Sequence, residues 1–132
     1  MTKEQPTIEL PYATILYEPP IVHIVFKTDI ELGFPETREL IASAEKISHK
    51  RPYVIFADAR VKVQVTREGR KVAANEKEAP YHKGSAILVE NNMLALGLNF
   101  FSGLITPSYP YRAFTDRESA MEWLKKISEN LK

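Results

Sequence analysis

The chain has 132 residues, of which 44% are hydrophobic and 27% charged, so its length and composition suit one globular domain. Lys and Arg number 18 against 17 for Asp and Glu, and this near balance argues against a dedicated nucleic-acid-binding protein, which needs a basic surface. The absence of cysteine excludes disulfides and cysteine-ligated zinc, and no apolar stretch has the ~20 residues of a membrane span, so we expect a cytoplasmic protein.

The N-terminal part predicts an antiparallel pair of strands. Residues 1–9 are polar, and we expect them to be flexible. Residues 12–18 and 21–27 are rich in β-branched and aromatic side chains, and Pro19-Pro20 interrupts them as a tight connection does. The two segments therefore read as a hairpin at the edge of a sheet.

A helix and a buried strand follow. Pro35 suits the first turn of a helix, where its missing N–H costs little. The segment 36–48 carries one apolar helical stripe, formed by Leu40, Ile41, Ala44 and Ile47. Residues 52–58 are a continuous apolar run that ends in Asp58, which is typical of a parallel strand covered on both faces.

The C-terminal half alternates between helices and strands. We expect helices at 66–79 and 92–105 and strands at 85–90 and 109–114. A last helix is expected to begin with a capping box of Thr115 and Glu118 and to bury one stripe, Ala120, Leu124, Ile127 and Leu131. The order ββαβαβαβα predicts a single α/β domain over 1–132, with four helices, right-handed βαβ crossovers and a mixed sheet that is mostly parallel.

The sequence offers little that is typical of an active site. The three histidines lie far apart, without metal-ligand spacing, and the common glycine-rich nucleotide motifs and the nucleophile elbow are missing. Asp58, Arg60 and His82 are the loose candidates for an enzyme. Residues 60–83 hold seven Lys or Arg against three Glu, which fits either a solvated helix face or a dock for an anionic partner. We expect no catalytic residue, metal or cofactor.

The helix predicted at 92–105 carries no charge and has two apolar faces. A helix packed on one side of a sheet needs only one, so neighbouring structure, a homodimer contact or a lipid-like ligand has to cover the other. The candidate contact residues on this helix are Leu94, Leu98, Phe100, Phe101 and Ile105.

The segment after this helix adds two tyrosines and an arginine, Tyr109, Tyr111 and Arg112, around Pro110. Tyr and Arg are favoured anchors in interfaces, so these residues are further candidates for a partner or ligand contact. The alternative is that the rings pack down on the preceding helix.

The layout resembles a known fold family. The element order, together with "YVIFADARVKVQVTREGR", resembles the STAS fold of the anti-sigma-factor antagonists. From about Tyr12 onward the chain is similar to small, single-domain SpoIIAA-like bacterial proteins, in "REGRKVAA", "NFFSGL", "PSYPYRAFTD" and "AMEWLKKI". This resemblance implies a mixed-sheet domain with four helices, and it implies that a partner protein or ligand, and no reaction, is the target.

The resemblance also points to one position in the chain. The antagonists carry a phosphorylatable Ser in an Asp-Ser-Ser-Gly motif where a helix begins, and this motif falls on Thr66-Arg67-Glu68-Gly69. Only Gly69 matches, so the switch Ser is absent, and Thr66 is the expected N-cap of the helix. Glu68 could supply a fixed negative charge near the helix N-terminus. We therefore expect a non-enzymatic regulatory or protein-binding module, or alternatively a small apolar-ligand binder that uses helix 92–105.

Overall fold

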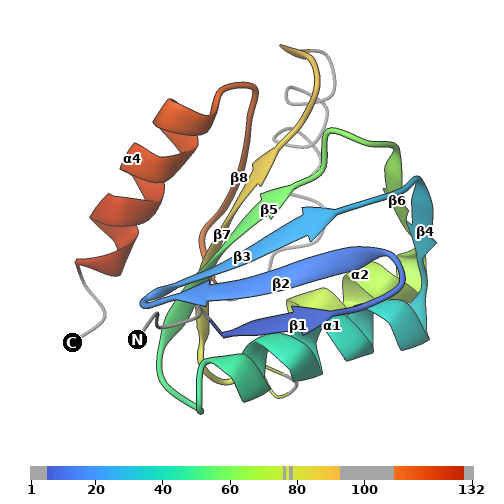
Figure 1. The fold of residues 1–132 in the computed structure, drawn as a ribbon, viewed down its shortest axis with the longest axis horizontal. Coiled ribbons are helices and arrows are strands. Elements are labelled where there is room, and N and C mark those ends of the chain that lie inside the picture. Colours follow the sequence, from blue (N-terminus) through green and yellow to red (C-terminus); the bar gives the residue numbers. More distant parts are fainter. Residues whose placement is uncertain (1–5, 76, 78, 93–108, 130–132) are drawn as a thin grey trace, which may run out of the picture.

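A computed structural model describes residues 6–75, 77, 79–92 and 109–129, and its centre is a six-stranded sheet of order β1-β2-β3-β5-β7-β8 (Figure 1). β1 and β3 each pair antiparallel with β2, and β3, β5, β7 and β8 run parallel to one another. The sheet is therefore mixed, as the sequence predicts. The strands are β1 (Thr7–Glu9), β2 (Ala13–Glu18), β3 (Ile21–Phe26), β5 (Tyr53–Asp58), β7 (His82–Leu88) and β8 (Tyr111–Phe114).

The predicted hairpin is confirmed, and a third strand that was not predicted pairs with it. β2 and β3 pair from Ala13 opposite Phe26 to Glu18 opposite Ile21, across the Pro19-Pro20 connection. Residues 7–9 were expected to be flexible, but they form β1, which pairs with β2. No strand was predicted here, because a strand of three residues is too short to show an alternating pattern in a polar segment.

A second, two-stranded sheet was not predicted. β4 (Ile30–Leu32) and β6 (Val63–Val65) pair in parallel, and each strand leads directly into a helix. β4 precedes α1 (Phe34–Ile47), and β6 precedes α2 (Arg67–Ala74). The small sheet thus places two helix starts next to each other.

Helices cover the two faces of the large sheet unequally. The larger core lies between the sheet and α1, whose predicted stripe of Leu40, Ile41, Ala44 and Ile47 is buried. The smaller core lies under α4 (Arg117–Ser128), where Ala120 and Leu124 pack on Val54 and Phe56 of β5. All six residues of β5 are buried, as the continuous apolar run predicts for a strand covered on both faces.

α4 packs mainly on β5, β7 and β8, and Ile21 of β3 packs against the core beneath it (Figure 1). The outer face of β2 and β3 is only partly exposed, because His23 at its centre is buried. Val25 of β3 lies on this face, and 42% of its surface is exposed.

Two predictions about helices need correction. The described residues carry three helices where four were predicted, because the helix expected at 92–105 falls on residues that lie outside the description from 93 onward. The N-cap of α4 is Asp116, whose side chain accepts a hydrogen bond from the backbone N–H of Ser119 at 3.1 Å, and not Thr115. Both residues can cap a helix, so the sequence allows either of two registers one residue apart.

Candidate functional site

The resemblance to the antagonists predicts that their switch motif falls at the start of α2, where hydrogen bonds hold the backbone in place. The Thr66 side-chain oxygen accepts a hydrogen bond from the Gly69 N–H at 3.0 Å, which confirms Thr66 as the N-cap. Its N–H donates to the Leu32 carbonyl of β4 at 2.9 Å, and its carbonyl accepts from Arg70 at 2.9 Å. The hydroxyl of Thr66 is thus used to close the helix end.

Gly69, the one residue that matches the antagonist motif, is buried where α2 meets β4 and α1. A Cβ at this position would lie 2.5 Å from the Leu32 carbonyl oxygen and 2.8 Å from the Thr37 side-chain oxygen. Both distances are far below van der Waals contact. Close packing of the helices therefore explains the glycine without any switch.

α1 begins beside the start of α2. Gly33 is its N-cap residue, and its N–H donates to the Glu36 carboxylate at 2.8 Å. A Cβ on Gly33 would lie 3.9 Å from the Thr66 side-chain oxygen, so the two caps are neighbours. Pro35 lies in the first turn, as predicted.

An exposed aromatic side chain marks this pair of helix starts. Phe34 is the first residue of α1, and 47% of its surface is exposed, more than for any other large hydrophobic residue that the structure describes. The Arg38 guanidinium lies 5.4 Å from the centroid of its ring. We call the exposed residues Phe34, Pro35, Arg38, Arg67 and Glu68 the helix-start surface.

The loose candidates for an enzyme do not come together. Asp58 and Arg60 form a two-point ion pair, with N–O distances of 2.9 and 2.7 Å, after the carboxyl end of β5. The Arg60 guanidinium holds the pKa of Asp58 below its usual value. His82 lies at the other end of the sheet, because it pairs with Tyr53, the first residue of β5. Asp58 is thus tied to Arg60, and His82 is remote from both.

The buried His82 ring has two polar neighbours. Its Nε2 lies 3.0 Å from the Gly84 carbonyl oxygen and 2.6 Å from the Ser85 hydroxyl. In the tautomer that carries its proton on Nε2 this nitrogen donates to the carbonyl, and in the other tautomer it accepts from the Ser85 hydroxyl. Burial lowers the pKa of His82 to about 4.

The tyrosines before and within β8 face the interior, whereas Arg112 is exposed. The Tyr109 hydroxyl donates to the Ala73 carbonyl of α2 at 2.8 Å, and its ring meets the His82 ring edge-on at 3.9 Å. Burial raises the pKa of both Tyr109 and Tyr111. The Arg112 guanidinium lies 5.3 Å from the Phe114 ring. The predicted contact residues Leu94, Leu98, Phe100, Phe101 and Ile105 lie outside the described residues.

Metal-binding groups and membrane-spanning helices can be looked for in the described part of the chain. There, no three His, Asp or Glu side chains gather in a way that could hold a metal ion. Among the same residues, no helix is both long and apolar enough to cross a membrane.

A comparison with known protein families assigns the chain to one of them. Residues 15–128 match the model of a family described as a domain of unknown function, DUF7793. The chain belongs to the DUF7793 family. No curated protein matches this DUF7793 chain significantly.

A solved structure supports the predicted fold of this DUF7793 domain. The domain is similar to the crystal structure of an uncharacterised protein of the DUF3478 family with a SpoIIAA-like fold, from Shewanella loihica PV-4. The TM-score is 0.57 at 12% sequence identity, over 94% of this chain and 98% of the other. At this identity the likeness shows the fold alone, and it confirms the predicted SpoIIAA-like resemblance.

Sequence reasoning missed Phe34 in the DUF7793 domain. Phe34 lies seven residues before Ile41, so helical periodicity assigns it to the buried stripe of α1. The structure buries Ile41 and leaves Phe34 exposed. A periodic pattern cannot show where the sheet beneath a helix ends, so no local signal reveals this surface.

Proposed function

We propose that this DUF7793 domain is a non-enzymatic regulatory module that binds a partner protein through the helix-start surface. The observation that carries the proposal is the exposure of Phe34 beside the position to which the resemblance assigns the antagonists' switch. Aromatic and arginine side chains are favoured anchors at protein interfaces, and Arg38 stacks on Phe34 here. The partner would therefore need an apolar group that covers the Phe34 ring.

Binding of this kind would be constitutive, without a phosphorylation switch. Arg67 and Glu68 stand at the two Ser positions of the motif, and the Thr66 hydroxyl is used as a helix cap. Glu68 lies in the first turn of α2, where the helix dipole favours a negative charge. Glu68 would then supply a permanent charge where the antagonists carry a removable one.

The absence of catalysis is part of the same proposal. Asp58 and Arg60 neutralise each other at one end of the sheet, and burial lowers the pKa of His82 to about 4 at the other. A general acid or base has to lie within reach of the reacting group with its pKa near the working pH. None of these three residues satisfies both conditions.

Apolar-ligand binding stays a prediction from the sequence. It depends on the helix expected at 92–105, whose residues from 93 onward lie outside the described part of the chain. Native mass spectrometry after gentle purification tests this alternative, and a lipid-sized adduct would be the positive result.

Site-specific photo-cross-linking tests the proposal. A photoreactive phenylalanine analogue replaces Phe34 in cells of the source organism, and the matched control places it at Glu122, an exposed position on α4 across the sheet. We expect a protein adduct from position 34 that is absent from position 122. Equal adducts at both positions, or none at position 34, would contradict the proposed surface.

A second variant separates binding from folding. With the photoreactive group at Arg38, the change Phe34→Asp should remove the adduct while the circular dichroism spectrum and the thermal midpoint stay close to those of the parent. Phe34 is half exposed, so its loss removes little core packing. A cross-link that survives Phe34→Asp would show that Phe34 is not the anchor.

A further inference from the structure

We propose that the end of α1 and the turn after it form a docking site for a membrane surface that contains anionic lipids. The site consists of four exposed residues, Lys46, His49, Lys50 and Arg51, which we call the basic turn. It lies at the far end of α1 from the helix-start surface, about 20 Å away for a helix of 14 residues. The proposal does not depend on the proposed function.

Hydrogen bonds give the backbone of the basic turn a fixed shape. The His49 N–H donates to the Lys46 carbonyl at 3.1 Å. The Lys50 N–H donates to the Glu45 carbonyl at 3.2 Å. These two bonds form a Schellman motif, in which Ser48 is the C-cap and His49 follows it. The exposed side chains therefore start from a well-defined backbone.

Two residues of the basic turn have a backbone conformation that favours glycine. The φ angle is 56° at His49 and 57° at Lys50, and no other described residue has a positive φ. A side chain in this left-handed region crowds its own backbone, so the residue after a C-cap is commonly glycine. The helix dipole favours a cation in the last turn, which Lys46 supplies, and it does not require a left-handed His or Lys. Strain of this kind points to a role for the side chains.

The basic turn carries positive charge that no acid compensates. Residues 46–51 hold three Lys or Arg and no acid, and the whole chain has a net charge of +1, so the remainder carries −2. Among the residues that the structure describes, no carboxylate forms an ion pair with the turn. The preceding acid, Glu45, has a buried carboxylate oxygen, and burial together with this carboxylate raises the pKa of Tyr53. Glu45 therefore faces the core, beside Tyr53.

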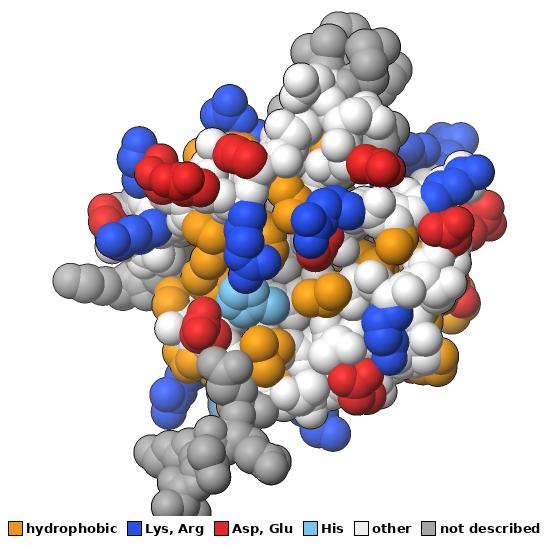
Figure 2. Space-filling model, turned by 45° about the horizontal axis from the view of Figure 1, so that its top comes forward, with side chains coloured by type: hydrophobic (Ala, Val, Ile, Leu, Met, Phe, Trp, Pro, Cys, Tyr) orange, Lys and Arg blue, Asp and Glu red, His pale blue; other side chains and the backbone are white. Residues whose placement is uncertain are grey.

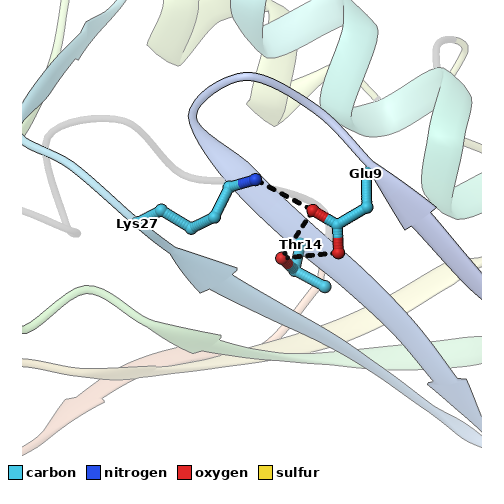
Figure 3. A network of polar contacts seen from close by, with 3 residues as sticks. All are labelled: Glu9, Thr14 and Lys27. Atoms are coloured by element: carbon cyan, nitrogen blue, oxygen red, sulfur yellow. Dashed lines mark hydrogen bonds and ion pairs between the residues drawn. The ribbon is translucent and has the colours of Figure 1, made fainter.

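Several other cations on the surface have acidic partners. Lys27 donates to Glu9 at 2.8 Å, and the Thr14 hydroxyl donates to the same carboxylate at 3.0 Å (Figure 3). Arg60 pairs with Asp58 at 2.7 Å. On the face that Figure 2 shows, Lys and Arg side chains lie among Asp and Glu side chains. Positive charge is compensated in these places, whereas at the basic turn it is not.

The basic turn lacks the apolar centre that a protein interface needs. Such interfaces have a core of apolar or aromatic side chains. Among the described residues, the large hydrophobic side chains that are exposed are Val25 and Phe34. Phe34 lies at the other end of α1, and Val25 lies near the carboxyl end of β3, whereas the basic turn precedes β5. Neither residue can anchor a partner at the turn.

An anionic lipid surface needs no such anchor. Its headgroups are mobile and gather around hydrated cationic groups, and each Lys or Arg at the surface raises binding about fivefold. The remaining charge of −2 is repelled by the same surface, so the basic turn is the part that faces it. A nucleic acid, whose phosphates form long rows, would need a longer basic footprint than residues 46–51 provide.

Flotation with lipid vesicles tests the proposal on the full chain. Vesicles of phosphatidylcholine with ~30% phosphatidylglycerol should bind the wild-type protein at ~50 mM salt, and vesicles of phosphatidylcholine alone should not. Binding should fall about tenfold or more at ~500 mM salt, because screening shortens the range of the attraction. No binding to the anionic vesicles, or equal binding to both kinds, would overturn the proposal.

Charge reversal tests the location of the site. Lys50→Glu should weaken vesicle binding by about 25-fold, since it changes the charge of the turn by two. Lys62→Glu makes the same change at an exposed residue just before β6 and should leave binding nearly unchanged. An equal loss in both variants would show that overall charge attracts the vesicles. Tighter binding to soluble polyglutamate than to vesicles, at equal charge concentration, would assign the turn to an acidic protein instead.

Lys50→Gly separates the role of the side chain from folding. It should raise the thermal midpoint by roughly 3 °C or more, because glycine relieves the left-handed conformation. The same variant should weaken vesicle binding about fivefold, because one cation is lost. A side chain kept for structure predicts the reverse, a lower midpoint with unchanged binding, and that result would contradict the proposal.

Discussion

Gly69 allows the backbone of α2 to approach β4 and α1 more closely than any other residue would. The position carries no left-handed backbone conformation, and the reason for glycine is space alone. A motif-based alignment would count this glycine as a remnant of a phosphorylation site. Its surroundings show a packing requirement that holds with or without a switch.

Gly69→Ala should lower the free energy of unfolding by about 1–3 kcal/mol, the range for overpacking in a close contact. Alanine favours a helix by about 1 kcal/mol over glycine, so helix propensity alone predicts the opposite sign. Urea denaturation measures the difference. Lys71→Ala, an exposed change in the same helix, is the control and should alter stability by less than about 0.5 kcal/mol. A Gly69→Ala protein as stable as the parent would refute the close approach.

Individual residues could be predicted from sequence where a local rule applies. Thr66 was predicted as an N-cap, because an oxygen-bearing side chain stands directly before an expected helix, and the structure confirms it. Phe34 could not be predicted as exposed, because its exposure depends on where the neighbouring elements end. The pairing of Asp58 with Arg60 likewise depends on the shape of a loop that the sequence does not specify.

At the scale of elements, α4 offers a direct comparison of two possible starts. Thr115 with Glu118 and Asp116 with Ser119 both have the spacing of a cap and its partner. The structure selects Asp116. The choice depends on the path of the chain from β8, which carries Phe114 into the smaller core.

Asp116→Ala should therefore reduce the free energy of unfolding by about 1 kcal/mol, the usual cost of losing an N-cap. Thr115→Ala removes no cap and should have little effect. Denaturant unfolding of the two variants side by side is the measurement, with Asp116→Asn as a control that retains a capping oxygen. If Thr115→Ala lowered the free energy of unfolding more than Asp116→Ala, Thr115 and not Asp116 would be the N-cap.

Elements with strong patterns were predictable, and short ones were not. β2, β3, β5 and α1 carry long runs of β-branched residues or a full helical stripe, and all four were predicted. β1, β4 and β6 have three residues each and depend on pairing with distant partners. Such strands are determined by the tertiary fold, which explains why a local reading misses them.

At the scale of the whole molecule, His82 connects several parts of the domain. Its ring stacks on Tyr53 of β5 at 5.5 Å and contacts the Tyr109 ring before β8. Tyr109 in turn binds the backbone of α2. Protonation of His82 would place a charge among these rings, so its cost should appear in the stability of the entire domain.

The pH dependence of stability should show this cost. The pKa of His82 is about 4 in the folded protein against 6.5 when unperturbed, so the unfolded chain binds more protons between these values. The stabilisation is complete above pH 6.5 and is lost as the pH falls toward 4, by up to about 3 kcal/mol. Urea denaturation at pH 7, 5.5 and 4 measures it.

A variant isolates this contribution from that of the carboxylates. His82→Gln keeps an N–H donor for the Gly84 carbonyl and does not titrate, so its stability should fall less between pH 7 and pH 4 than that of the wild type. Equal slopes for the two proteins would mean that His82 does not titrate as its burial implies.

The architecture was predictable because strands and helices alternate along the chain, and that order restricts the topology strongly. The exposure of Val25 on the outer face of β3 was not predictable. Leu16 and Val25 alternate with buried residues as they would if a helix covered them. Whether α4 reaches them depends on the width of the sheet, a property of all six strands together.

The β4–β6 ladder has a thermodynamic consequence for the helix-start surface. Both helices leave the same small sheet, and backbone hydrogen bonds from Thr66 to Leu32 and from Ile30 to Lys62 fix their starting points. A partner that docks there would meet a surface already in its bound shape, so little conformational entropy of this domain would be lost on association. Affinity would then depend on the fit and ordering of the partner, and changes in the partner should alter binding more than changes in the rigidity of this domain.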